Sequence, residues 1–287
     1  MNIGVVFPQT EIGGDPASVR AYAQAVQEMG FTHLAVYDHV LGADTSVRPN
    51  WSGPYTSESL FHEPMVLFGY LAALVPRLEL VTEVIILPQR QTVLAAKQAA
   101  EIDVLTGGKL RFGVGIGWND VEYEGLAMNF LNRARRFEEQ VDLLRQLWTQ
   151  PVVTFAGKYH RITAAGINPL PVQRPIPLWI GASAESALKR AAEVADGYFP
   201  QRPLEGGWPT TIEKMRTWRA EAGRDPTTFG IDARVNTANS TPYDWRKAAE
   251  DWRGLGASHL TINTMGAGLR GPDAHVKRLR EALAAVR

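Results

Sequence analysis

Two segments of the sequence carry side chains that could move protons. His39 follows Asp38 at the end of the apolar run 33–37, and an imidazole can act as an acid or a base near neutral pH. Glu83 lies inside the otherwise apolar run 78–87. An unpaired carboxylate there is costly to bury, so Glu83 must face an opening, sit on a bulge or pair with a cation such as Arg90. His39 and Glu83 are therefore candidate catalytic residues. A satisfied structural pair is the alternative at each position.

A glycine-rich strand is the second place where a ligand could lie. Gly113, Gly115 and Gly117 alternate along the apolar stretch after Gly107 and Gly108, so one face of this strand has almost no side chains. Either another strand or a flat ligand must approach the backbone there. The run lacks the glycine spacing, the long following helix and the N-terminal position of a dinucleotide-binding fingerprint, so we exclude that function.

Further side chains could hold or line a ligand. Ser183 opens the helix expected after residues 176–182, where backbone N–H groups suit a phosphate, although an ordinary N-cap is the commoner role. Trp51, Trp118 and Tyr123 could line a flat cavity, although isolated aromatics more often belong to a core. The spacing of the His, Asp and Glu residues indicates no metal site, and neither a serine-hydrolase elbow nor a P-loop occurs.

The hydrophobic pattern indicates how these residues are positioned, because strand and helix patterns alternate along the whole chain. The expected strands are residues 3–7, 33–37, 78–87, 110–116, 176–182, 197–199, 229–236 and 258–264. Eight strand–helix units predict a single (β/α)8 TIM barrel over residues 1–287, with an open doubly wound sheet as the alternative. Loop insertions are expected at about residues 42–61, 151–175 and 200–210, at the C-terminal face where such barrels bind ligands.

Composition excludes several classes of protein. The 30 Lys and Arg residues balance 30 Asp and Glu residues, which gives no electrostatic reason to expect nucleic acid or a membrane as partner. The absence of cysteine rules out disulfides, thiolate metal sites and a cysteine nucleophile. The N-terminus lacks a signal-peptide pattern, and no apolar run approaches the ~20 residues of a membrane span. We therefore expect a cytoplasmic protein.

Several segments in combination resemble the luciferase-like flavin and deazaflavin oxidoreductases, over roughly residues 1–200. The segments that carry the resemblance are Phe7-Pro8, Asp38-His39, residues 87–92 (LPQRQT), 96–100 (AKQAA), 103–108 (DVLTGG), 113–119 (GVGIGWN), 179–183 (WIGAS) and 195–197 (ADG). The most similar branch is the F420-dependent one found in actinobacteria. The resemblance implies a TIM-like barrel, a cofactor across the C-terminal ends of the strands, and a homodimer.

The resemblance also implies roles for individual residues. A strand bulge, often with a non-proline cis peptide, would fall at Thr82-Glu83-Val84 and support the cofactor ring, and Glu83 stands where the family usually has a small residue. Asp38 would hydrogen-bond the ring, and His39 would lie near its reactive carbon. The other implied cofactor contacts are Gly115, Asn119, Gly181, Ala182 and Ser183.

The reaction follows from the cofactor. F420 would mean hydride transfer to or from a small organic substrate, FMN would allow monooxygenation with oxygen, and a non-catalytic flavin- or deazaflavin-binding protein is a third possibility. A basic groove formed by Arg135, Arg136, Arg161 and Arg202 would favour the acidic tail of F420. Ile116 stands where the F420-dependent sugar-phosphate dehydrogenases have a glutamate base, which argues against that reaction.

Overall fold

Parallel strands form a closed barrel in the computed structural model, which describes all 287 residues. The strand order is β3-β2-β1-β11-β10-β9-β8-β5-β4, and β3 also pairs with β5, which closes the sheet. Segments β3 and β4 are two parts of one interrupted strand, so nine segments make eight barrel strands. The predicted (β/α)8 barrel is confirmed, and the alternative of an open sheet is wrong.

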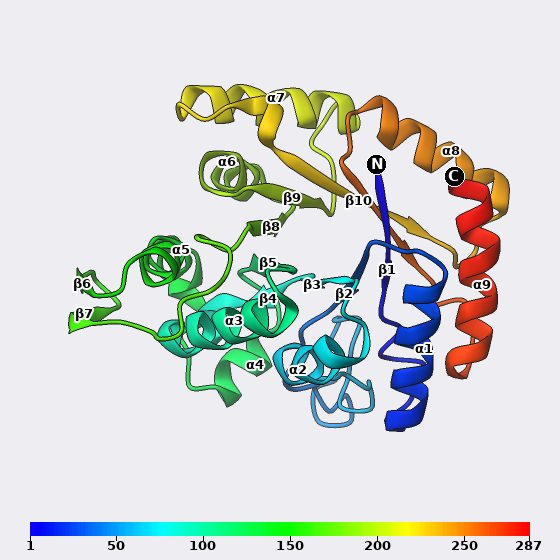
Figure 1. Cartoon of the computed structure of the whole chain (residues 1–287), viewed down its shortest axis with the longest axis horizontal. Coiled ribbons are helices and arrows are strands. Elements are labelled where there is room, and N and C mark those ends of the chain that lie inside the picture. The colour runs from blue at the N-terminus through cyan, green and yellow to red at the C-terminus, as the bar shows by residue number, and fades with distance from the viewer.

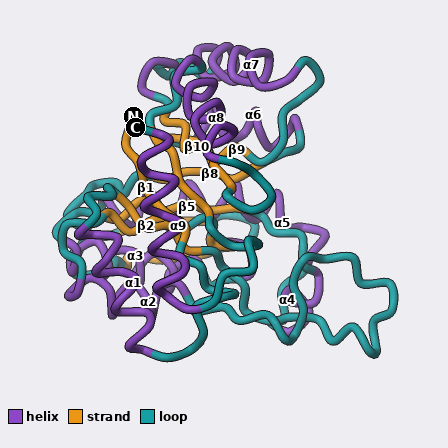
Figure 2. Tube along the Cα trace, turned by 90° about the vertical axis from the view of Figure 1, so that its right-hand side faces the viewer, coloured by secondary structure: helices purple, strands orange, loops and turns teal.

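The elements follow one another in the alternation that the sequence predicted. The barrel strands are β1 (Asn2–Val6), β2 (His33–Val36), β3 (Glu79–Thr82) with β4 (Ile85–Ile86), β5 (Leu110–Gly115), β8 (Leu178–Ala182), β9 (Gly197–Pro200), β10 (Gly230–Asn236) and β11 (His259–Asn263). The outer helices are α1 (Pro16–Glu28), α2 (Pro64–Leu74), α3 (Thr92–Thr106), α5 (Arg133–Thr149), α6 (Glu185–Val194), α7 (Gly207–Glu221), α8 (Pro242–Gly254) and α9 (Gly271–Val286). Helix α9 lies beside α1, and the two termini lie at the same end of the barrel (Figures 1 and 2).

The segments expected as insertions differ in structure. Residues 42–61 form an irregular loop with a single bridge between Ala43 and Thr56. Residues 151–175 hold the antiparallel hairpin of β6 (Val153–Ala156) and β7 (Arg161–Ala165), which lies outside the barrel (Figure 1). Within residues 200–210, α7 already begins at Gly207. The short helix α4 (Asp120–Gly125) and the surrounding loops project from one side of the barrel (Figure 2).

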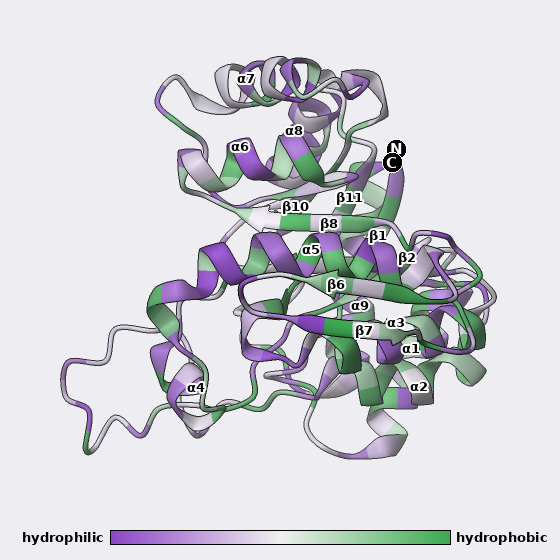
Figure 3. Cartoon of the chain, turned by 90° about the vertical axis from the view of Figure 1, so that its left-hand side faces the viewer, coloured by the Kyte–Doolittle hydropathy of each residue, from purple (hydrophilic) through white to green (hydrophobic).

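Strand alternation separates two kinds of core. Outward-facing apolar residues such as Leu34, Val36 and Val114 are buried beneath the helices. The covering helices alternate between hydrophilic and hydrophobic colour along their length (Figure 3). The barrel interior is mixed. It holds the buried polar residues His33, Arg111 and Asp232 together with a small apolar cluster of Ala35, Val81, Trp179 and Phe199. None of the helices combines the length and the apolar composition needed to cross a membrane.

Candidate active site

A cavity of about 780 Å³ opens at the C-terminal ends of the barrel strands. Ten of the residues predicted from the sequence line it: Asp38, His39, Glu83, Val84, Gly115, Trp118, Asn119, Gly181, Ala182 and Ser183. Parallel strands bring these residues together because all their C-terminal ends meet at one rim. The wall also includes small residues on the side of β5, β8 and α6, and polar ones on the side of β1, β2, β10 and β11.

Three predicted residues lie outside this wall. Thr82 is fully buried, and its hydroxyl donates to the Gly113 carbonyl at 2.8 Å behind the cavity. Tyr123 is a core residue whose hydroxyl donates to the Ile116 carbonyl at 2.7 Å, so its assignment to the substrate pocket was wrong. Trp51 lies behind Trp118, with ring centroids 5.7 Å apart, and supports the wall without lining it.

The interruption between β3 and β4 lies at the position that the resemblance implied. Thr82 ends β3, Ile85 begins β4, and the peptide bond between Glu83 and Val84 is cis. The bare face of β5 accommodates this interruption. A Cβ atom added to Gly113 would lie 1.9 Å from the Thr82 carbonyl oxygen, and one added to Gly115 would lie 2.7 Å from a methyl carbon of Val84. The glycines are therefore required first by packing against the neighbouring strand.

Asp38 joins the strand ends beside the cavity. One carboxylate oxygen accepts from the Ile86 N–H at 3.0 Å, and the other accepts from Arg90 at 2.6 Å. Arg90 also lies 3.3 Å from Glu63 at the start of α2. Of the three alternatives left open for Glu83, pairing with Arg90 does not occur, because the short helix η1 (Leu87–Gln89) turns Arg90 toward Asp38. Glu83 lies instead at the strand interruption and lines the cavity.

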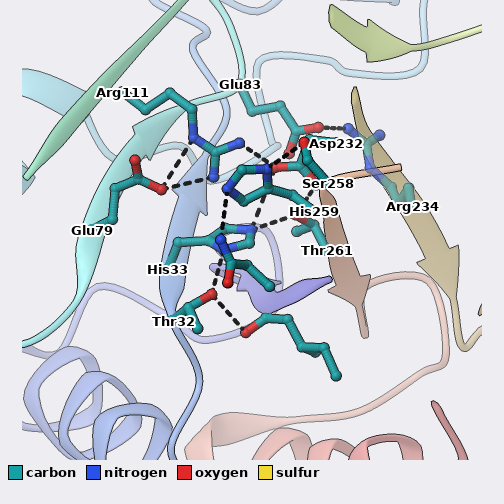
Figure 4. Close-up of polar contacts among 12 residues, drawn as sticks. Thr32, His33, Glu79, Glu83, Arg111, Asp232, Arg234, Ser258, His259 and Thr261 are labelled. Carbon is teal, nitrogen blue, oxygen red and sulfur yellow. Dashed lines mark hydrogen bonds and ion pairs between the residues drawn. The ribbon is translucent and has the colours of Figure 1, made fainter. Parts of the chain in front are cut away.

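Glu83 instead forms an ion pair with Arg234 of β10, on the opposite side of the barrel mouth (Figure 4). The Glu83 side chain is 1% exposed and that of Arg234 is 21% exposed. Burial raises the pKa of Glu83 above its usual range, although the Arg234 charge opposes the shift. No local sequence signal indicated this partner, since 151 residues separate the two.

His39 is oriented by Glu122, a residue that the sequence did not single out. The His39 Nδ1 atom lies 3.0 Å from a Glu122 oxygen, which also accepts from the Val40 N–H at 2.8 Å. Gln89 donates to the other oxygen at 3.1 Å. Burial opposes ionisation of Glu122, but these hydrogen bonds prevail and lower its pKa. The signal that could have identified Glu122 is its place at the third residue of α4, after the N-cap Asn119.

Aromatic rings enclose the imidazole. Tyr55 and Phe61 lie with ring centroids 4.7 and 4.8 Å from that of His39, and Trp118 lies at 5.7 Å. The Nε2 atom has no hydrogen-bond partner in the protein, and His39 lines the cavity. A hydrogen bond from Nδ1–H to Glu122 leaves Nε2 as the nitrogen that can exchange a proton with a ligand.

A charged network fills the barrel below the cavity (Figure 4). Arg111 donates to Asp232 at 2.7 Å and to Glu79 at 2.9 Å, and its guanidinium lies 4.6 Å from the Trp179 ring centroid. Burial disfavours the Asp232 carboxylate, yet the Arg111 charge and His33 hold its pKa well below the usual range. These groups satisfy one another and stabilise the barrel floor.

The small-residue side of the cavity fits a flavin-type cofactor. Val84, Gly115 and Gly181 line this side together and carry no polar side chain; a Cβ atom added to Gly115 or Gly181 would lie 2.7 or 3.2 Å from the Val84 side chain. At the edge of this side, α6 begins with Ala184 as N-cap, which provides no side-chain cap, so the predicted capping by Ser183 was wrong. The exposed Ser183 hydroxyl and the uncapped N–H groups of α6 suit phosphate oxygens.

The expected contact from Asn119 and the expected basic groove are not free to bind a cofactor in this cavity. Asn119 lines the cavity, but its oxygen accepts from the Val121 N–H at 3.1 Å and its amide donates to the Leu41 carbonyl at 3.2 Å. None of Arg135, Arg136, Arg161 and Arg202 lines the cavity, so the expected basic groove is not part of its wall.

Several known proteins are similar to this chain in sequence or in fold. An uncharacterized protein of Mycobacterium tuberculosis is 29% identical over 238 residues, which cover 80% of each chain. The FMNH2-dependent dimethylsulfone monooxygenase of Pseudomonas fluorescens is 31% identical over 219 residues, 75% of this chain and 56% of that protein. The coenzyme F420-dependent tetrahydromethanopterin reductase of Methanopyrus kandleri has the same fold, with a TM-score of 0.74, 14% identity and coverage of 100% of this chain and 99% of that one. The family model described as luciferase-like monooxygenase matches residues 1–286, and the chain therefore belongs to this family.

Proposed function

We propose that the protein is an F420-dependent oxidoreductase that transfers a hydride between the deazaflavin and a small organic substrate. The observation that carries the proposal is the His39–Glu122 pair at the cavity wall. Hydride transfer to or from a carbon bonded to oxygen or nitrogen requires a proton to move at that heteroatom. His39 is placed to exchange it, because Glu122 holds Nδ1 and leaves Nε2 toward the cavity.

The other residues of the wall bind and orient. Val84 and Gly115 would support the ring, while Ser183 and the start of α6 would hold phosphate oxygens. The deazaflavin, when bound, supplies or accepts the hydride at a ring carbon. Trp118 and Tyr55 pack around His39, which limits the access of water to the proton-transfer nitrogen.

Titration with two reduced cofactors tests this proposal. Purified protein is mixed anaerobically with reduced F420 and, separately, with FMNH2, and the change in cofactor fluorescence or absorbance is followed. We expect saturable binding of reduced F420 and its oxidation in the presence of carbonyl or imine electrophiles. Binding of FMNH2 alone would overturn the proposal.

An FMNH2-dependent monooxygenase is the second candidate. Arg234 is the single Lys or Arg side chain in the cavity wall, so the wall offers little positive charge to bind the polyanionic tail of F420. The relation to a curated FMNH2-dependent monooxygenase points the same way. This candidate predicts oxygen consumption when FMNH2 is supplied by a reductase, whereas the F420-dependent enzyme consumes none.

We also propose that the protein is a homodimer. Neighbouring helices α2 and α3 expose apolar side chains on their outer faces: Val66, Tyr70, Val93, Leu94 and Leu105. Such a patch is typical of a surface that is covered by a partner.

A further inference from the structure

Arg234 places one positive charge in a cavity wall that otherwise holds only carboxylates and neutral groups. The other charged side chains of the wall are the acids Glu11, Asp38, Glu83 and Glu122. Asp38 is neutralised by Arg90, and Glu122 is occupied by hydrogen bonds from His39 and backbone. An incoming ligand therefore meets one accessible cation, that of Arg234.

The guanidinium of Arg234 is held from one side only. Its Nη2 atom binds Glu83, and its Nε atom is enclosed without a partner. The Nη1 atom has no hydrogen-bond acceptor in the protein and is not enclosed, which leaves it open to the cavity. The Tyr37 ring lies beneath, 5.2 Å from the guanidinium carbon. The Glu83 side chain is 1% exposed and that of Arg234 is 21% exposed, so the protein encloses the carboxylate but leaves part of the guanidinium accessible from the cavity.

Two phenol hydroxyls, which are neutral hydrogen-bond donors, lie beside the Arg234 guanidinium. The hydroxyls of Tyr37 and Tyr55 have no hydrogen-bond partner in the protein, and both residues line the cavity. Glu11 lies at the same end, but one of its oxygens accepts from the Gly266 N–H at 2.7 Å and the other lies 3.4 Å from His275. A planar group with two oxygens matches a guanidinium N–H and a phenol better than a single carbonyl does.

We propose that the substrate carries a carboxylate or a similar delocalised oxyanion, and that Arg234 selects it, with Glu83 as the positioning partner of Arg234. This inference rests on the proposed function for the identity of the cofactor that shares the cavity. It assigns the polar side of the cavity to the acid group of the substrate and the small-residue side to the cofactor.

The Glu83 carboxylate competes with an anionic ligand for the same guanidinium. The groups that act on Glu83 are Arg234 and Asp232 from β10, Arg111 from β5 and Tyr37 from β2. A second negative charge at Arg234 further disfavours ionised Glu83, so binding of an acid takes up a proton and strengthens as the pH falls. Removing the Glu83 charge should have the same effect at constant pH.

Calorimetric titration of the cofactor-free protein (residues 1–287) with benzoate and with its neutral counterpart benzamide tests the inference. We expect wild type to bind benzoate at least tenfold more tightly than benzamide. Glu83→Gln should bind benzoate several-fold more tightly than wild type does. The double variant Glu83→Gln/Arg234→Gln, which leaves no orphaned charge, should lose the preference for the acid.

Arg190→Gln is the matched control, because Arg190 donates to Glu138 at 2.8 Å on the outer helices, away from the cavity. This substitution should leave the affinities for benzoate and benzamide unchanged. If the double variant fails to fold by circular dichroism, Arg234→Lys replaces it and should reduce the preference without abolishing it. A wild-type affinity for benzoate no higher than that for benzamide, including no binding of either, overturns the inference. So does a preference for benzoate that is undiminished in the double variant or, where it is used instead, in Arg234→Lys.

Titrating the same wild-type protein with reduced F420 distinguishes failure of this inference from failure of the proposed function. Preference for benzoate without any binding of reduced F420 would overturn the proposed function and leave the substrate class standing. Binding of reduced F420 without preference for benzoate would do the reverse.

Discussion

Glu122→Gln tests whether the buried carboxylate under His39 organises the cavity wall. Its two oxygens accept hydrogen bonds at 2.8 Å from Val40, 3.0 Å from His39 and 3.1 Å from Gln89. A hydrogen bond to a charged acceptor contributes about 1 kcal/mol more than a neutral one. The substitution keeps the shape but removes the charge, so we expect the free energy of unfolding at pH 7 to fall by roughly 2–3 kcal/mol.

The direction of the pKa shift of Glu122 determines how its contribution to stability changes with pH. Hydrogen bonding holds the pKa of Glu122 in the folded protein below the 4.5 of an unperturbed glutamate. The carboxylate therefore contributes its full stabilisation above that value, and the contribution is lost as the pH falls through the lower pKa of the folded state. The difference between wild type and Glu122→Gln should accordingly shrink in acid.

Urea unfolding at pH 7 and at acidic pH measures both effects. Glu124→Gln on the same helix is the matched control, since Glu124 and its partner Arg48 are exposed and should contribute less than about 0.5 kcal/mol. Turnover of the reduced cofactor should fall roughly 30-fold in Glu122→Gln for about 2 kcal/mol of lost orientation of His39, with cofactor affinity unchanged. A stability loss below about 1 kcal/mol at pH 7, or one that does not shrink in acid, would refute the reasoning.

Three further changes probe the barrel and its surface. Asp232→Asn should lower the free energy of unfolding by about 3–5 kcal/mol at neutral pH, because the Arg111 side chain is 2% exposed and would lose its enclosed counter-ion. An unchanged midpoint of urea unfolding would contradict this. Gly113→Ala should destabilise by about 3 kcal/mol, because the new Cβ would meet a backbone oxygen at 1.9 Å; wild-type stability in urea would show that the bulge can move. Leu94→Glu, at a side chain 52% exposed, should convert the proposed dimer to a monomer in light scattering; a wild-type monomer would refute the dimer itself.

Local sequence signals were sufficient for the architecture and for the rim at which the cavity lies. Alternating strand and helix patterns predicted the closed barrel, and the barrel rule then pointed to Asp38, His39 and Glu83 at the strand ends. The glycine alternation in β5 indicated a close approach but not its cause. The structure shows that the approaching group is the neighbouring interrupted strand.

Only the tertiary structure decided which charged groups meet. Arg90 is near Glu83 in sequence, yet Glu83 pairs with Arg234, and His39 is held by Glu122, 83 residues away. Such partners depend on strand register around the closed barrel and on where a short helix after a strand turns its side chains. Neither leaves a periodic signal in the chain. The sequence by itself therefore determined the barrel and the rim, while closure of the barrel determined the chemistry of the cavity.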